Sequence, residues 1–201
     1  MAKRSTSKPK IIVAPTQAQL ARKFRPYAVE LGYLLYSWNR LQEVFGRLFW
    51  DLTGISNGRL PLAIWYAVPS DRTQREMLRA AIHAHPARLK DHPRARDDLI
   101  WMINRANSLA DQRNDAVHAP LIFNTDARGT KLRSAYLAGH PRALKLKDKN
   151  LMVEFRWYAD SADVLSRFGE RAHYCLLQNG AAWPDRPKMP HLDLPLQKQQ
   201  A

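Results

Sequence analysis

Apolar residues recur at three- and four-residue intervals through most of this chain, which is the spacing of amphipathic α-helices. The clearest run extends from about Pro26 to Thr53 and ends at Gly54 and the polar cluster 56–58. Its apolar residues form one wide stripe, made by Leu31, Leu34, Leu35, Trp38, Leu41, Phe45, Leu48, Phe49 and Leu52. A helix with so wide a stripe must pack against several other helices, so the pattern predicts a mainly α fold.

Two shorter segments follow this first helix. Residues 60–67 are apolar, and Pro69 breaks the chain after them. A helix then begins at Ser70 or Asp71, whose side chains can accept hydrogen bonds from the backbone of a first helical turn. This helix ends near Pro86.

A long helix extends from about Pro93 to His118. Its apolar positions again have helical spacing: Leu99, Ile100, Met102, Ile103, Ala106, Leu109, Ala110 and Val117. Pro120 biases the residue before it away from the helical region, so we expect the helix to end near His118. The last turns therefore carry Arg113 and His118, where the helix dipole favours cations.

Apolar and polar residues alternate after this helix, which is the pattern of β-strands. Residues 142–147 and 151–158 alternate on either side of a polar turn and predict an antiparallel β-hairpin, and residues 131–138 are a candidate third strand. The whole block, residues 121–158, is too small to bury a core of its own. We therefore expect a small hairpin inserted before the last helix.

The pattern divides the chain into three parts. Residues 1–25 contain seven basic and no acidic residues and are interpreted as a flexible basic arm. The helical domain occupies residues 26–178, and its last helix is capped by Asp160 or Ser161. The proline-rich tail, residues 179–201, cannot form a regular helix.

Charge adds an expected partner. The chain has 32 Lys and Arg residues against 18 Asp and Glu residues, which gives a formal net charge of +14. Such an excess attracts polyanions, of which nucleic acid is the commonest in solution. A basic protein without a nucleic-acid partner is the alternative.

The cysteine content and the hydropathy of the chain indicate its expected cellular location. Cys175 is the single cysteine, so no disulfide can form within the chain, and a reducing cytoplasm is the expected location. No run of residues approaches the length of about 18 apolar residues that a membrane-spanning helix needs, and we expect no membrane partner. The chain lacks a glycine-rich phosphate loop, and no cofactor is expected.

The candidate chemistry lies in residues 113–118, RNDAVH. Arginine grips phosphate with a forked donor geometry, and histidine exchanges protons near neutral pH. His118 would act on a ribose 2′-hydroxyl or on the leaving 5′-oxygen, and Arg113 would stabilise charge on the phosphoryl oxygens. Asn114 would hold the substrate or orient His118, and Asp115 would fix the imidazole tautomer. Because the 2′-hydroxyl is the nucleophile, this chemistry needs no metal.

Helix geometry separates the two key side chains. On a regular helix Arg113 and His118 differ by about 140° around the axis, whereas Asn114 and His118 share a face. A working site therefore needs either an unwound helix end or a second copy of the helix across a two-fold axis. The second arrangement predicts a homodimer with a positively charged cleft between its subunits.

The same segment resembles the signature of HEPN domains, the helical ribonucleases of toxin–antitoxin and phage-defence systems. Residues 113–118 match its form of arginine, a polar residue, three variable residues and histidine. Residues 30–54 resemble the long first helix of these domains, residues 100–118 their third helix, and residues 160–177 their closing helix. The resemblance covers residues 26–177, interrupted by the strand insertion.

This resemblance implies a HEPN-like bundle of about four to five helices and a dimer with a composite site. It also implies a metal-independent endoribonuclease, with Arg113 and His118 as catalytic residues and Asn114 as the polar residue that often follows the arginine. RNA is the implied substrate, and an antitoxin protein is a candidate partner. A non-catalytic RNA-binding or protein-interaction module on the same bundle is the alternative function.

Other candidate sites have weaker signals. His83, His85 and His92 could ligate a metal, but they lack a nearby cysteine or acidic ligand pattern. Five of the six tryptophans could stack on bases, although their place on the apolar stripes favours the core. Glu43 and Asp51 could line a carboxylate site, although exposure to solvent, or pairing with Arg40 and Arg47 of the same helix, is the simpler expectation.

Overall fold

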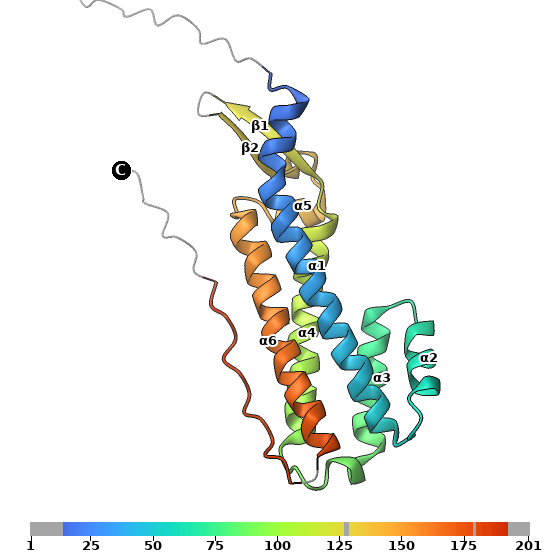
Figure 1. Ribbon diagram of the computed structural model, residues 1–201. Helices are drawn as coiled ribbons and strands as arrows, with labels where there is room; N and C mark the ends of the chain where they lie inside the picture. Colours follow the sequence, from blue (N-terminus) through green and yellow to red (C-terminus); the bar gives the residue numbers. More distant parts are fainter. Residues whose placement is uncertain (1–13, 127–128, 179, 193–201) are drawn as a thin grey trace, which may run out of the picture.

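The computed structural model describes residues 14–126, 129–178 and 180–192, and it shows a mainly helical bundle with a small antiparallel hairpin before the last helix (Figure 1). This agrees with the predicted fold class. The first thirteen residues of the predicted arm and the last nine of the predicted tail lie outside the described residues. The elements in chain order are α1 (Gln17–Thr53), α2 (Arg59–Ala67), α3 (Asp71–Ala84), the 3-10 helix η1 (Pro86–Leu89), α4 (Ala95–His118), β1 (Leu121–Asp126), β2 (Gly129–Ser134), the 3-10 helix η2 (Tyr136–Ala138), α5 (Pro141–Lys145) and α6 (Leu151–Leu177).

Four of the helices form the bundle. α1 packs along α6, α4 packs against α6 on one side and α3 on the other, and α3 closes the ring against α1. Each of them supplies side chains with no exposed surface, including Phe45, Leu78, Leu99 and Leu165. Burying one such side chain contributes about 1.5–3 kcal/mol, so this core is the main source of stability. None of the helices in the described segments combines the length and apolar character needed to cross a lipid bilayer.

α1 begins earlier than the apolar pattern predicts. The expected helix start near Pro26, with a flexible arm before it, is wrong for residues 17–25, which are helical. The side chain of Thr16 accepts a hydrogen bond from the backbone N–H of Gln19, and the Gln19 side chain accepts one from the backbone N–H of Thr16. This capping box starts the helix upstream, and Pro26 then removes only one backbone hydrogen bond.

The hairpin lies nearer to α4 than predicted. β1 and β2 follow α4 directly and pair in antiparallel register. The predicted pairing of residues 142–147 with 151–158 is therefore wrong, whereas the candidate strand at residues 131–138 overlaps β2. Gly129, with φ of 118°, opens β2, and this conformation favours glycine over any residue with a side chain.

α6 also begins earlier than predicted. It starts at Leu151 after the cap Asn150 and continues through the predicted cap at residues 160–161. Leu151, Phe155 and Tyr158 have helical spacing and are all buried. A run this short fits both the strand and the helix period, and burial of this face within the bundle selects the helix.

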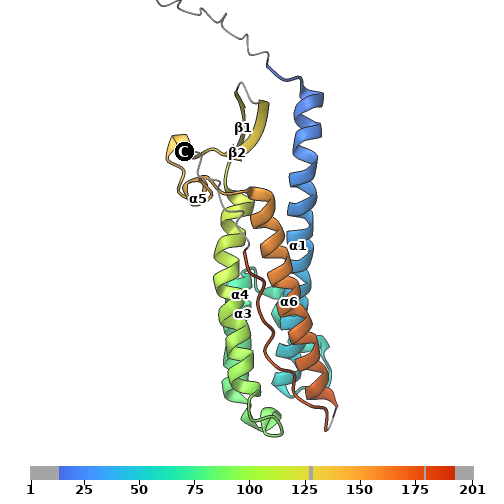
Figure 2. The ribbon, with the colours of Figure 1, turned by 90° about the vertical axis from the view of Figure 1, so that its left-hand side faces the viewer.

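Residues 180–192, after α6, form no helix or strand and lie along the bundle between α4 and α6 (Figure 2). The indole N–H of Trp183 donates to Oδ2 of Asp98 on α4 at 3.0 Å, and Arg186 pairs with the other oxygen of this carboxylate. The indole N–H of Trp157 on α6 donates to the carbonyl of Pro190 at 2.9 Å. These contacts fasten the proline-rich segment to both helices.

Replacing Trp183 with alanine is expected to lower the free energy of unfolding by about 2–3 kcal/mol, because a large ring is lost from the surface of the core and the buried Asp98 loses a donor. Urea denaturation followed by circular dichroism measures the change. Lys188→Ala, an exposed substitution in the same segment, should leave stability within about 0.5 kcal/mol. Equal stability of the two variants would show that the segment is not held by Trp183.

Candidate functional site

The predicted catalytic segment forms the C-terminal end of α4. The backbone N–H of Ala119 donates to the carbonyl of Asp115 at 3.0 Å, so the helix is regular as far as His118. Ala119 is extended before Pro120, as the clash between a proline ring and a preceding helical residue requires. The end of α4 is therefore not unwound, which was one of the two predicted ways of joining Arg113 to His118.

Arg113 points toward α1 and α3. Its Nη2 donates to Oδ2 of Asp71 at 2.8 Å, and its guanidinium carbon lies 4.7 Å from the centre of the Trp38 ring. Burial lowers the pKa of Arg113, and the carboxylate of Asp71 opposes this by stabilising the charged form. An arginine stays charged near neutral pH, and its side chain is 16% exposed. The structure thus holds a cation at the edge of the bundle through contacts with Asp71 and Trp38.

Asp71 also holds a second guanidinium. Its Oδ2 accepts a hydrogen bond from the indole N–H of Trp38 at 3.2 Å and lies 3.5 Å from Nη1 of Arg75. Arg75 is 1% exposed, and its pKa is lowered by burial and, less strongly, by the neighbouring Arg113, while Asp71 raises it. Two cations share one carboxylate, so this corner of the bundle keeps an excess of positive charge that suits an anionic ligand.

His118 occupies a different side of α4 and is exposed. Asn114, one turn earlier on the same face, is half-buried. On this regular helix the side chain of Arg113 leaves the axis about 140° away from that of His118. Within one protomer the structure therefore does not bring the predicted catalytic pair together.

Asp115 is paired with α5. Its Oδ2 lies 2.9 Å from Nζ of Lys145, and the residue is buried. Arg142, also on α5, donates to the backbone carbonyl of Asn114 at 3.0 Å. Two cations of α5 thus fasten that helix to the end of α4, where the helix dipole is negative. The structure gives Asp115 this structural partner, and its role in orienting His118 stays a prediction.

α3 is shorter than its neighbours and leaves one side of α1 uncovered. α3 begins at Asp71, beside Trp38 of α1, whereas α1 continues from Trp38 toward its N-terminal end at Gln17 (Figure 1). Leu35 and Phe24 precede Trp38 by three and fourteen residues, so they lie on the same side of α1. They are 39% and 40% exposed. An apolar strip therefore continues along α1 from the point where α3 and the contacts of Arg113 end.

The sequence pattern did not identify the neighbours of Arg113. Trp38 belongs to the predicted apolar stripe, and Asp71 lies at a predicted helix start, and both assignments are correct. Arg75 carried no signal at all. These residues come from two helices far from Arg113 in the chain, and their meeting depends on how the helices pack.

The three histidines considered as an alternative metal site have separate contacts. Nδ1 of His83 lies 2.6 Å from Nη2 of Arg96, and Nε2 of His92 lies 3.3 Å from the carbonyl of Cys175. In the parts of the chain that the structure covers, no three side chains of the metal-binding types gather closely enough to hold an ion. The histidines have separate local contacts instead.

The two acids considered as an alternative carboxylate site also have separate partners. Glu43 accepts a hydrogen bond from the hydroxyl of Tyr66 at 2.7 Å, and Oδ2 of Asp51 lies 2.9 Å from Nε2 of His173. Glu43 is exposed to solvent, which is one of the two simpler expectations for these acids, whereas Asp51 is buried and faces a histidine in place of an arginine of α1. Trp65, at 1% exposed, lies in the core, as the spacing of the tryptophans favoured.

Comparison with profiles of known protein families, with curated protein sequences and with solved structures finds no match to this chain.

Proposed function

We propose that this chain is a metal-independent endoribonuclease of HEPN type that acts on RNA as a homodimer. The observation that carries the proposal is the end of α4, which carries an exposed imidazole, His118, and a guanidinium, Arg113, that is held by Asp71 and is 16% exposed, in a chain of net charge +14. In phosphodiester transfer to a ribose 2′-hydroxyl, an imidazole can act as the general base and a guanidinium can stabilise the charge on the phosphoryl oxygens.

A second copy completes the site in this proposal. Arg113 and His118 leave a regular helix in different directions, so one protomer offers each group without its partner. The exposed apolar side of α1, with Phe24 and Leu35, begins beside Trp38 and supports an interface at this place. A two-fold axis there would set Arg113 of one protomer opposite His118 of the partner subunit, twice in each dimer.

The reaction then follows from these two groups. The neutral imidazole of His118 takes the proton of the 2′-hydroxyl while the 2′-oxygen attacks phosphorus. The bond from phosphorus to the 5′-oxygen breaks, and that oxygen takes a proton from water. Arg113 donates hydrogen bonds to the non-bridging oxygens as their charge grows. The products are a 2′,3′-cyclic phosphate and a 5′-hydroxyl end.

The resemblance extends the proposal to a biological setting. The HEPN domains that the chain resembles are ribonucleases of toxin–antitoxin and phage-defence systems, so in this proposal the chain acts on RNA in the cytoplasm. An antitoxin protein would then control this chain by covering the cleft between the protomers.

Incubation of the full chain with single-stranded RNA in excess EDTA tests the reaction. We expect cleavage to persist and to leave 2′,3′-cyclic phosphate ends, while DNA of the same sequence stays intact because it lacks the nucleophile. Loss of cleavage in EDTA would instead indicate a metal-dependent hydrolase. Cleavage of DNA would contradict the proposed attack by the 2′-hydroxyl.

A non-catalytic RNA-binding module is the second candidate function. The contacts of Arg113 with Asp71 and Trp38 favour it, because they give this arginine a structural role that needs no substrate. This candidate predicts RNA binding without cleavage, and binding that His118→Ala does not change.

A further inference from the structure

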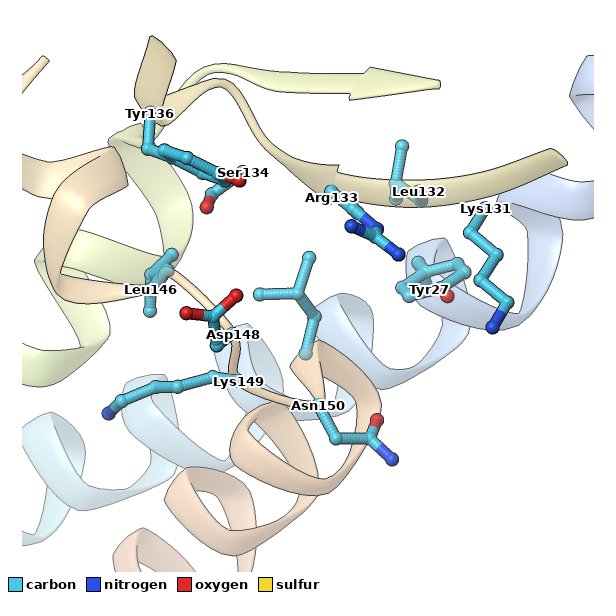
Figure 3. Close-up of a pocket in the computed structure, with 11 residues that line it drawn as sticks. Tyr27, Lys131, Leu132, Arg133, Ser134, Tyr136, Leu146, Asp148, Lys149 and Asn150 are labelled. Carbon is cyan, nitrogen blue, oxygen red and sulfur yellow. The ribbon is translucent and has the colours of Figure 1, made fainter. Parts of the chain in front are cut away.

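A pocket lies between the hairpin, α1 and the segment that leads into α6 (Figure 3). Its volume is about 440 Å³, which is within the range of sites that hold small organic ligands. β1 begins three residues after His118, so the pocket lies at the same end of the bundle as the end of α4 (Figure 1). The pocket does not include Arg113 or His118 and plays no part in the proposed reaction.

Positive charge dominates the lining of this pocket. Lys131, Arg133 and Lys149 line it, against a single acid, Asp148. Lys149 is neutralised by the buried Glu154, with Nζ 3.1 Å from Oε2. Lys131 and Arg133 lie on one face of β2 because they are two residues apart, and they remain as the cations available to a ligand.

The guanidinium of Arg133 is directed into the pocket (Figure 3). Among the residues whose side chains the structure describes, no carboxylate lies within ion-pair distance of it. A forked guanidinium without an acidic partner is the side chain best suited to grip a phosphate. The pocket therefore favours an anion, and a phosphate in particular.

Two tyrosines face the pocket from opposite ends. Tyr27 comes from α1 and Tyr136 from η2, with the Arg133 guanidinium between them (Figure 3). Both rings are half-buried, so their positions are held while part of each ring stays accessible. Aromatic side chains beside a basic groove are the usual platforms on which unpaired bases stack. The ligand thus needs a phosphate and a flat ring.

Asp148 adds a third requirement. Its carboxylate is turned toward the interior of the pocket (Figure 3), and its φ of 60° is unusual for a residue with a side chain. A carboxylate repels phosphate but accepts hydrogen bonds from sugar hydroxyls. The 2′-hydroxyl is the donor that distinguishes RNA from DNA at such a place.

We propose that this pocket binds one nucleotide of a single-stranded RNA, with Lys131 and Arg133 on its phosphate, a tyrosine stacked on its base and Asp148 on its 2′-hydroxyl. The site goes beyond the proposed nuclease function, because it binds RNA whether or not the end of α4 cleaves it. A strand held here would pass close to the end of α4.

Fluorescence anisotropy of labelled oligouridine tests the proposal, in the full chain carrying His118→Ala so that no cleavage occurs. Arg133→Glu is expected to raise Kd by about 10-fold or more. It should also reduce the slope of log Kd against log salt concentration by about one to two, which corresponds to the loss of one or two phosphate contacts. Tyr136→Ala should raise Kd by about 5-fold or more through lost stacking. Arg105→Glu, an equal charge reversal on the exposed face of α4, is the matched control.

The comparison with the control distinguishes binding of RNA in this pocket from general electrostatic attraction of RNA to a basic protein. A change in Kd of less than about 2-fold for Arg105→Glu supports the pocket, because surface charge alone acts over a short screened distance. Equal weakening by Arg133→Glu and Arg105→Glu would overturn it. Unchanged thermal unfolding of Arg133→Glu shows that the fold is intact.

The same measurement with DNA tests the sugar contact. Asp148→Asn keeps the shape of the side chain and tolerates positive φ, but it removes the charge. We expect this variant to bind DNA more tightly and to lose most of the preference for RNA. A preference unchanged by Asp148→Asn would overturn the sugar contact. Displacement of RNA by free AMP at millimolar concentration would support the nucleotide pocket. It would also show that a free nucleotide can occupy the pocket in place of a nucleotide of the RNA.

Discussion

Replacing His118 with alanine is expected to lower the rate of RNA cleavage by a factor of about 10² to 10⁴, which is the usual contribution of a general acid–base group. Because His118 is exposed, the same change should leave the free energy of unfolding within about 0.5 kcal/mol of the parent value. Single-turnover cleavage of end-labelled RNA in EDTA measures the rate, and urea denaturation measures stability.

A second exposed histidine provides the control. His191→Ala, in the segment after α6, should cleave at the parent rate because it lies outside the proposed site. If His118→Ala also cleaved at close to the parent rate, His118 would not be the acid–base group. Loss of activity in both variants would point to a general effect on the protein.

Mixing of variants tests whether the site is shared between protomers. Arg113→Ala and His118→Ala are each expected to be inactive alone. After exchange of subunits about half of the dimers are mixed, and each mixed dimer has one intact pairing of Arg113 with His118, so activity should return to about one quarter of the parent value. A mixture as inactive as its components would show that both groups act from one protomer, against the arrangement proposed here.

Replacing Asp71 with alanine is expected to lower the free energy of unfolding by about 2–3 kcal/mol, because it leaves the guanidinium groups of Arg75 and Arg113 without their shared carboxylate. The value is below that for a fully buried pair, since the Asp71 side chain is 30% exposed and partly screened by water. Asp71 also accepts a hydrogen bond from Trp38, and this bond is lost as well. Urea denaturation measures the change.

Two further variants separate the effect of the Asp71 charge on stability from the effect of any substitution in this region. Asp71→Asn keeps an acceptor for the Trp38 indole and should lose less stability than Asp71→Ala. Asp111→Ala, on the exposed side of α4, should change stability by less than about 0.5 kcal/mol. If Asp71→Ala were no more harmful than Asp111→Ala, the cluster around Asp71 would not hold α1, α3 and α4 together.

Local signals were sufficient wherever one stretch of chain determines its own conformation. The Ser70 cap starts α3 as predicted, and Pro120 ends α4 at His118 because its ring excludes a helical residue before it. The separation of Arg113 from His118 also follows from helix geometry alone. These features depend on neighbours in sequence, so the sequence pattern contains them.

Weak local signals were misleading where two conformations fit the same residues. Pro26 suggested a helix start, but the capping box at Thr16 lies upstream of it. The alternation in residues 151–158 suggested a strand, but Phe155 and Tyr158 become buried only when this segment is helical and packed in the bundle. The energy of that packing exceeds the small preferences of a short run.

The sequence by itself determined a mainly helical, basic chain with an arginine and a histidine on different sides of one helix end. Only the tertiary structure decided that Arg113 lies on Trp38 beside Asp71 and Arg75, that Asp115 pairs with Lys145, and that Arg133 enters a pocket between two tyrosines. The physical reason is that helix formation is governed by nearby residues, whereas these contacts join elements distant in the chain and arise only when the core packs.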